Sequence, residues 1–318
     1  MPQGQPFDPR VSVCVISYNH APFVEPALRS VLAQITPFPF EIVFADDCSP
    51  DGTLKLAERV AAEASVPFRF LPRTHNLGPR ANFLDLLAET RGEYVAYLEA
   101  DDYWVDSARL AEQVALLDAH PELSGCFGKA NVVDASDRVL SDFFDHHGRR
   151  PPATEIDQRM VVQRGSVAPA CTMVFRRSAI LDLPPWYLKD GSHQGLSVIL
   201  TSSGKLKYVE KVWGHYRVHP GGTWSAASEE HKCVADYRYA VGLASDPILS
   251  QAHTREIGRR LALATFALCR QRLRRPGGLA ELPGDLRPAV SRTALRSVVW
   301  AIPELARLTA RRVAGARR

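Results

Sequence analysis

The first 120 residues alternate short apolar runs with amphipathic segments, and this alternation is the feature that most constrains the fold. Val11 to Ile16 is apolar except for Ser12, as is typical of a strand buried on both faces of a parallel sheet. Pro22 to Gln34 then carries apolar residues at helical spacing. The pattern repeats, with further strands expected at 41–45, 68–71 and 93–98, and helices at 54–64, before residue 90 and at 110–119. Short connections between these elements predict an α/β fold with a mostly parallel, doubly wound sheet.

Beyond residue 122 the alternation is less regular. Strands are expected at 124–135 and 170–175, a helix at 195–202, and two short extended pieces at 206–210 and 212–217. The polar span 142–163 contains Arg149-Arg150-Pro151-Pro152 and predicts a mobile loop.

Three of the expected strands end in polar segments. These are Ser17-Tyr18-Asn19, Asp46-Asp47-Cys48-Ser49 and Glu99-Ala100-Asp101-Asp102. Because the carboxyl ends of parallel strands meet at one edge of a sheet, the three segments should share a cleft. The last segment places three carboxylates within four residues, and such charges repel one another unless a cation neutralises them. The cleft therefore suits a divalent metal and a nucleoside diphosphate, although the last segment alone would equally fit a solvated acidic turn.

The composition is that of an ordinary globular protein. Hydrophobic residues make up 46% of the chain and charged residues 23%, which argues against extensive disorder. No apolar run reaches the roughly 18–20 residues of a spanning helix, and Met1 to Arg10 is polar rather than a signal sequence, so a cytoplasmic protein is expected. The six cysteines lie far apart without a C-x-x-C pair, which predicts reduced thiols and neither a zinc site nor a disulfide framework.

The C-terminal segment 251–318 differs electrostatically from the rest of the chain. It holds fifteen arginines and no lysine against four acidic residues, a balance of +11, so the net charge of +4 leaves −7 for the preceding 250 residues. Two basic amphipathic helices on the anionic inner face of a cell membrane are one expectation. The alternative is that these helices pack on the preceding α/β domain with their arginines in solvent, and nucleic acid is not the expected partner. The apolar positions at helical spacing are Ile257, Leu261, Ala264 and Leu268, then Val298, Ile302 and Leu305.

Four loops and a distal segment resemble those of the family 2 glycosyltransferases, which have the GT-A fold. The matching segments are the first loop at Ser17-Tyr18-Asn19, D-D-C-S-P-D-G-T from Asp46, N-x-G-x-x-x-N from Asn76, L-E-A-D-D-Y-W from Leu98, Gly204-Lys205, and Tyr216 to Ser225. They match in order and spacing, so the resemblance covers about residues 10–226.

This resemblance implies a metal-dependent, inverting glycosyltransferase with a GT-A-like, Rossmann-related domain over 1–225. Residues from about 10 to 122 would form the nucleotide-sugar-binding half and about 123 to 225 the acceptor-binding half. A helical, Arg-rich extension over 226–318 would follow, docked at the inner face of the cell membrane or free in the cytoplasm.

The resemblance also implies roles for individual residues. Asp101 would be the main ligand of Mn²⁺ or Mg²⁺, with Glu99 and His219 as further ligands. For each residue a structural role is the alternative: Asp46 as a turn or cap residue, Arg80 as a surface charge, and His219 as a hydrogen-bonded loop histidine. The residues expected to bind the donor are Ser17, Tyr18, Asn19, Asp46, Asp47, Arg80, Glu99, Asp102 and Arg217.

The catalytic base is the point at which this sequence departs from the family. Family members carry an aspartate about eleven residues before the Gly-Lys pair, and His193 occupies that position here. Histidine can act as a general base near neutral pH. Asp190 lies three residues earlier on a glycine-flanked segment. Three possibilities stay open: His193 as the base, Asp190 as the base, or loss of transfer activity.

Two other functions are compatible with parts of this pattern. Loss of the base would leave a non-catalytic subunit that binds a sugar nucleotide or a glycan. A nucleotidyltransferase would need a Gly-rich phosphate loop after the first strand, where Ser17-Tyr18-Asn19-His20 stands instead. We therefore expect transfer of a sugar, with inversion, from a nucleotide-diphospho-sugar to a glycan, lipid-linked or protein acceptor. Synthesis of bacterial surface polysaccharide, lipopolysaccharide or another glycoconjugate is the expected setting.

Overall fold

The computed structural model describes residues 7–165, 168–190 and 193–272 of the chain. These residues fall into two compact units, each described here by itself. The first unit comprises Met1–Val161, Ser166–Leu183 and Leu196–Ser225, and the second comprises Val162–Gly165, Pro184–Gly195 and Ala226–Arg318.

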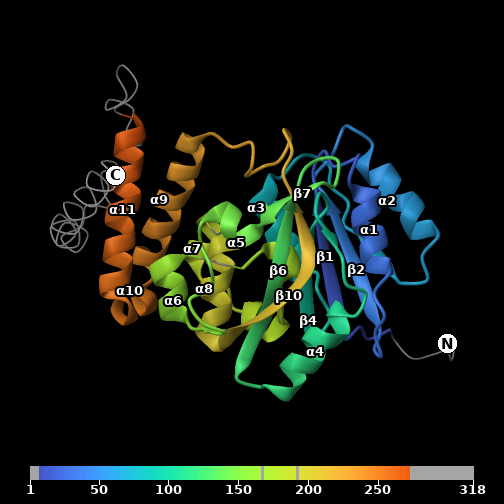
Figure 1. The fold of residues 1–318 in the computed structure, drawn as a ribbon, viewed down its shortest axis with the longest axis horizontal. Coiled ribbons are helices and arrows are strands. Elements are labelled where there is room, and N and C mark those ends of the chain that lie inside the picture. The colour runs from blue at the N-terminus through green and yellow to red at the C-terminus, as the bar shows by residue number, and fades with distance from the viewer. Residues whose placement is uncertain (1–6, 166–167, 191–192, 273–318) are drawn as a thin grey trace. The chain divides into compact units, whose positions relative to one another are not determined.

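One sheet dominates the first unit (Figure 1). Its strands are β1 Val11–Ser17, β2 Phe40–Asp46, β3 Phe68–Phe70, β4 Tyr94–Glu99, β5 Tyr103–Trp104, β6 Leu123–Val133, β7 Val139–Asp142, β8 Glu155–Ile156, β9 Val174–Arg176 and β10 Lys205–Arg217. The helices of the chain are α1 Val24–Leu32, α2 Thr53–Ala62, α3 Pro79–Ala88, α4 Arg109–Ala119, α5 Phe143–His147, α6 Gln158–Arg164, α7 Pro185–Asp190, α8 His193–Ser203, α9 Glu229–Ser245, α10 Pro247–Ala252 and α11 Thr254–Arg272, with short 3₁₀ turns at Ala170–Thr172 and Arg177–Ile180.

The strand order brings the three polar loops together. The sheet runs β3-β2-β1-β4-β9-β6-β10-β5, and β1 pairs in parallel with both β2 and β4. In this register Ser17 lies opposite Asp46, and Ile16 lies opposite Glu99. Since the three strands end side by side, the loops that follow them leave the sheet at one edge, as the sequence predicted.

Helices cover both faces of this sheet because the crossovers are right-handed and the strand order reverses at β1. Buried residues of α1, α2 and α4 pack with alternate residues of β1, such as Val13 and Val15, in the main hydrophobic core. On the other face α3 packs against β1 and β2, and its Phe83 ring meets Tyr97 edge to face at 4.9 Å. The strands are therefore apolar on both faces, which explains their continuous apolar runs.

The second half of the sheet is mixed rather than parallel throughout. β9 is inserted antiparallel between β4 and β6, whereas β10 runs parallel to β6. The two extended pieces expected at 206–210 and 212–217 form one strand, whose register with β6 shifts between Tyr208 and Val212. The far end of β10 pairs with β5, His215 opposite Tyr103, and so reaches the loop after β4. The predicted α/β fold class, with helices flanking a large and mostly parallel sheet, is confirmed.

The expectation of a mobile loop over 142–163 is wrong, because this span holds α5, β8 and part of α6. The side chain of Asp142 caps α5 by accepting the backbone N–H of Phe144 at 2.8 Å. Phe144, Ile156 and Val161 are each 1% exposed. The polar composition of the segment concealed these widely spaced apolar anchors, which only tertiary packing reveals.

In the second unit the expected apolar stripe of α11 is buried against α9. Leu261, Ala264 and Leu268 pack with Tyr237 and Ala240. The stripe of α11 is thus covered from within the same unit, and the stripe expected at 298–305 lies outside the described residues. No helix in the part of the chain that the structure describes has the length and hydrophobicity needed to cross a bilayer.

Candidate functional site

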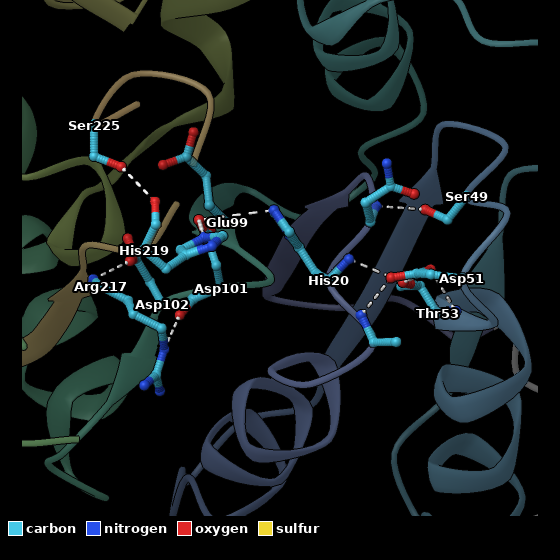
Figure 2. Close-up of polar contacts among 12 residues, drawn as sticks. His20, Ser49, Asp51, Thr53, Glu99, Asp101, Asp102, Arg217, His219 and Ser225 are labelled. Atoms are coloured by element: carbon cyan, nitrogen blue, oxygen red, sulfur yellow. Dashed lines mark hydrogen bonds and ion pairs between the residues drawn. The ribbon is translucent and has the colours of Figure 1, made fainter. Parts of the chain in front are cut away.

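The loop after β1 is fixed by the loop after β2. Asn19 adopts a left-handed conformation with φ of 59°, and its N–H donates to Ser49 Oγ at 2.8 Å. The N–H of His20 donates to Thr53 Oγ1 at 3.0 Å, while its carbonyl accepts the N–H groups of Phe23 and Val24 at 2.9 Å. Both ends of the His20 peptide unit are thus held, and the ring is turned toward the loop after β4 (Figure 2).

The aspartates of the loop after β2 bind groups of the protein itself. Asp46 accepts the N–H and the hydroxyl of Ser49 at 2.8 and 2.5 Å. Asp47 accepts the N–H groups of Leu77 and Gly78 at 2.7 and 2.8 Å and so fixes the start of α3. Burial raises the pKa of Asp46, although the hydrogen bonds from Ser49 oppose that effect. These carboxylates thus hold the loop after β2 and the backbone before α3 in place.

The loop after β4 uses its central aspartate differently. Asp101 Oδ2 lies 3.1 Å from Nε2 of His219 and 3.7 Å from Nε2 of His20. Its second oxygen, Oδ1, is buried without a hydrogen-bond partner, and the same is true of Nδ1 of His20. A buried polar atom without a partner costs about 1–3 kcal/mol, so this group of atoms is arranged for something other than stability.

Burial and mutual repulsion act on the acidic segment. Burial, and then the charge of Asp101, raise the pKa of Glu99 to about 8. Burial, followed by the charges of Asp101 and Glu99, also raises the pKa of Asp102. Burial alone would raise the pKa of Asp101, but the hydrogen bond from His219 and the charges of both histidines outweigh it and lower that pKa. Asp101 is therefore the member of the segment that most readily carries a negative charge.

The end of β10 is tied to the acidic loop through Arg217. Its backbone N–H donates to Asp102 Oδ1 at 2.8 Å, and its Nε donates to the carbonyl of Asp101 at 2.8 Å. The other guanidinium nitrogens contact the Asp134 carbonyl at 3.1 Å and Asp137 Oδ1 at 2.7 Å. The guanidinium carbon also lies 4.7 Å from the centre of the Phe23 ring. This geometry favours a positioning role for Arg217, which holds the segment that carries His219, over the donor contact implied by the resemblance.

Three ligand-type side chains converge on one point of the cleft. His20, Asp101 and His219 each offer one ligand atom, and these atoms lie within 4.8 Å of one another. Ligand atoms that bind one ion at about 2.1 Å lie roughly 3–4 Å apart, so a small adjustment would bring all three into a first shell. The unpartnered Oδ1 of Asp101 adds to this fit. The residues present therefore suit a divalent cation.

The other residues expected in the site occupy varied positions. Ser17 is buried, and its hydroxyl has no hydrogen-bond partner, whereas the Tyr18 side chain is 45% exposed at the rim. Arg80 is exposed in the first turn of α3. Glu99 lies outside the cluster of His20, Asp101 and His219, and its Oε1 accepts the hydroxyl of Tyr97 at 3.4 Å. All the donor-binding roles, and that of Glu99 as a ligand, stay predictions.

The two candidates for the base cannot be compared from geometry. α7 ends at Asp190 and α8 begins at His193, both in the second unit. Their side chains lie outside the described part of the chain, so both roles stay predictions.

Sequence reasoning missed His20 as a candidate ligand. The signal was its place three residues beyond the end of β1, next to the strand that carries the acidic segment. A lone histidine in a loop carries no local signature of metal binding, and its partners come from other loops. Only the paired register of β1 and β4 brings it to Asp101.

Comparison with known proteins supports this description. The family model for glycosyl transferase family 2 matches residues 12–183. The uncharacterized protein Rv1520 of Mycobacterium tuberculosis is 34% identical over 230 residues, which cover 70% of this chain and 62% of Rv1520. The poly(ribitol-phosphate) β-N-acetylglucosaminyltransferase TarS of Staphylococcus aureus is 31% identical over 112 residues, or 35% of this chain and 19% of TarS.

Two solved structures have the same fold. TarS 1–349 in complex with UDP-GlcNAc matches with a TM-score of 0.55 and 21% identity, over 91% of this chain and 79% of that one. The mannosyltransferase PcManGT from Pyrobaculum calidifontis, in complex with GDP-Man and Mn²⁺, matches with a TM-score of 0.56 and 18% identity, over 92% and 84%. The family match covers more than half of the chain and the strand order agrees with it. The chain therefore belongs to glycosyl transferase family 2 and has its GT-A fold.

Proposed function

We propose that the protein transfers a sugar, with inversion, from a nucleotide-diphospho-sugar to an acceptor hydroxyl. The observation that carries this proposal is the convergence of Asp101 and His219 at the edge of the sheet where the loops after β1 and β2 also end. Family membership supplies the reaction class, and the cleft supplies groups suited to a charged leaving group.

The donor is expected to lie across the carboxyl ends of β1, β2 and β4. Ser17, Tyr18 and Asn19 line the first loop, and Asp46 and Asp47 the second, where they would contact the base and ribose. Asp47 fixes the backbone at Gly78 and so shapes this wall through the third loop. Arg80, at the start of the next helix, would complete the pocket.

A divalent cation fits beside Asp101 and His219, and when bound it would neutralise the charge that develops on the departing nucleoside diphosphate. The residues of the chain would position this leaving group. Arg217 and Asp102 hold the two segments that carry His219 and Asp101 in register. Glu99 stands next to this pair and would meet the ribose or a water molecule.

The acceptor hydroxyl needs a base on the face of the sugar opposite the leaving group. His193, at the start of α8, and Asp190, at the end of α7, are the two candidates. A variant series decides between them. Replacement of the true base should lower kcat by about 10²–10⁴-fold while KM for the donor changes little.

A role in bacterial surface glycan synthesis is the setting that we propose. TarS, whose name records transfer to poly(ribitol phosphate), supports a cell-envelope acceptor. Because the match spans 62% of Rv1520, the acceptor could also depend on parts that this chain does not share. Docking to an anionic membrane would not use the apolar stripe of Leu261, Ala264 and Leu268, since that stripe packs on α9.

The test uses the purified chain with a panel of UDP-, GDP- and dTDP-sugars, with Mn²⁺ or Mg²⁺. We expect metal-dependent release of nucleoside diphosphate with at least one donor, loss of that release on chelation, and its recovery when metal is restored. A chain that neither hydrolyses nor transfers from any donor would refute the enzymatic proposal. Donor binding without turnover, across a broad acceptor panel, would instead support the non-catalytic subunit.

A further inference from the structure

His20 stands beside Asp101 although no motif of the sequence assigns it to the site. Its Nε2 lies 3.7 Å from Asp101 Oδ2, and its ring centre lies 6.0 Å from that of His219 in an edge-to-face arrangement. Figure 2 shows the ring of His20 directed from the loop after β1 toward Asp101 and His219. Two imidazoles therefore flank one carboxylate.

The position of His20 is built into the fold. His20 is 8% exposed, and its backbone is anchored through hydrogen bonds with Thr53 and with the first turn of α1. Its Nδ1 is buried without a hydrogen-bond partner. A core histidine retained only for stability would have both ring nitrogens paired, because an unpaired one costs about 1–3 kcal/mol. A ring that binds a ligand would explain why the free-energy cost of this unpaired nitrogen is tolerated.

Two explanations fit an imidazole at this distance from a carboxylate. In the first, a protonated His20 makes an ion pair with Asp101. The 3.7 Å between Nε2 of His20 and Oδ2 of Asp101 is longer than a hydrogen bond, whereas Nε2 of His219 lies 3.1 Å from the same oxygen. The geometry thus does not favour a direct ion pair of His20 with Asp101. In the second explanation His20 is a metal ligand, because an imidazole binds cations through a ring nitrogen in its neutral form.

We infer that His20 is a third protein ligand, beside Asp101 and His219, and that the resulting site prefers a first-row transition ion to Mg²⁺. The preference follows from the donor atoms, because imidazole nitrogen suits transition ions whereas Mg²⁺ favours carboxylate and water oxygens. Binding of the ion does not require the proposed transfer activity, but its role at the diphosphate rests on that proposed function.

The nitrogen count tests the inference directly. Mn²⁺ alone is added to the full chain, and pulsed electron paramagnetic resonance measures the ¹⁴N couplings of bound imidazole. The wild type should show two coupled histidine nitrogens, and His20→Gln and His219→Gln should each show one. A wild type with a single nitrogen, or a His219→Gln variant with none, would overturn the inference.

Affinity and selectivity give a second readout. The Mn²⁺ affinity of His20→Gln should fall at least about tenfold. Mg²⁺ should displace Mn²⁺ from the wild type only at about a hundredfold excess or more. Unchanged affinity in the variant, displacement by equimolar Mg²⁺, or no Mn²⁺ binding by the wild type would each contradict the inference.

His215→Gln is the matched control. His215 lies on β10 close to the same loop, but its Nδ1 pairs with the Tyr103 hydroxyl at 2.8 Å, and it is not a member of the cluster. This variant should keep both nitrogen couplings and the wild-type Mn²⁺ affinity. Melting of the metal-free proteins checks that each variant is folded, and the His219→Gln spectrum decides the question even if His20→Gln unfolds.

Failure of the inference and failure of the proposed function give different results. In one outcome the wild type shows a single coupled histidine nitrogen, and His20→Gln transfers sugar equally well with Mg²⁺ and Mn²⁺. This outcome would refute His20 as a third ligand and leave the proposed function intact. Two nitrogens in a wild type that turns over no donor would refute the function and leave the metal site intact.

Discussion

The loops after β2 and β4 leave the same edge of the sheet and are both rich in carboxylates, yet they use them in opposite ways. In the loop after β2, Asp46 and Asp47 accept hydrogen bonds from Ser49 and from the backbone at Leu77 and Gly78. In the loop after β4, Asp101 faces imidazoles and keeps one oxygen unpartnered. The count of acidic residues does not distinguish a loop whose carboxylates bind donors of the protein from one that keeps an oxygen without a partner, whereas the hydrogen-bond partners of each oxygen do.

The largest expected effect is that of Asp101→Asn. The change removes the charged ligand but keeps the size of the side chain, so donor turnover should fall by about 10²–10³-fold or more. Thermal stabilisation by Mn²⁺ should disappear, while the metal-free melting temperature stays near that of the wild type. Kinetics with the best donor and melting curves with and without Mn²⁺ measure this. If Mn²⁺ still stabilises the Asp101→Asn variant, Asp101 is not needed for metal binding and the contrast between the two loops is wrong.

Asp47→Ala should act on stability. The change removes the acceptor of the Leu77 N–H, whereas the Gly78 N–H keeps the side-chain oxygen of Asn76 at 3.0 Å. A lost hydrogen bond to a charged acceptor should lower the free energy of unfolding by about 2–3 kcal/mol, as measured by urea denaturation. Glu25→Ala is the control, since its ion pair with Arg29 joins two exposed side chains and should contribute little to the free energy of unfolding. Equal losses in the two variants would show that Asp47 does not support the loop.

Two glycines extend the comparison to the backbone conformation of the loops, because each has a positive φ angle and directly precedes a helix. Gly78 has φ of 83° and ψ of 156°, a region open almost only to glycine, whereas Gly52 has φ of 91° and ψ of 8°, in the left-handed region. No atom lies within 4 Å of a Cβ added at either position, so the cost of alanine is conformational. We expect a loss of about 2 kcal/mol for Gly78→Ala and about 1 kcal/mol for Gly52→Ala. The reverse order in urea denaturation would contradict this assignment.

The smallest effect concerns Asp51, at the start of α2. Burial opposes ionisation of its carboxyl, but hydrogen bonds from Thr53 and Ala21 outweigh burial and lower its pKa below the usual 3.8. A lowered pKa stabilises the fold above the unfolded-state pKa, and that stabilisation is lost as the pH falls through the folded-state value. Asp51→Asn should therefore be less stable than the wild type at pH 7, and the difference should shrink as the pH falls through the lowered pKa of Asp51. If the stability difference between the wild type and Asp51→Asn instead grows as the pH falls, the sign is opposite to the one expected and the explanation is refuted.

The sequence predicts the first half of the fold well because its signals are local. The apolar runs of β1, β2 and β4 and the helical stripes between them require a parallel sheet, and a parallel sheet requires the loops to share an edge. The segment 142–163 could not be predicted in this way, because Phe144 and Ile156 are isolated apolar residues in a polar context. Their burial depends on contacts far along the chain.

The same distinction between local and long-range signals applies to the candidate site. The acidic segment at Glu99 to Asp102 could be located from the end of its strand. The individual roles could not, since Arg217 has its nitrogens bound to the protein and His20 gains its partners only through the register of the sheet. Spacing in the sequence predicts which loops meet, while side-chain direction decides which atoms remain for a ligand.

The hydrogen bond between the Arg217 backbone and Asp102 joins segments 115 residues apart, and His219 lies 118 residues beyond Asp101. A ribosome adds about 5–20 residues per second, so roughly 6–24 s pass between synthesis of these two partners. During that time the nascent chain can form β1 to β4 but has no His219 to complete the cluster. Under the proposed metal role, capture of the ion would be a late event in the life of the chain, and a truncated product of stalled synthesis would be recognisable by its failure to retain the ion.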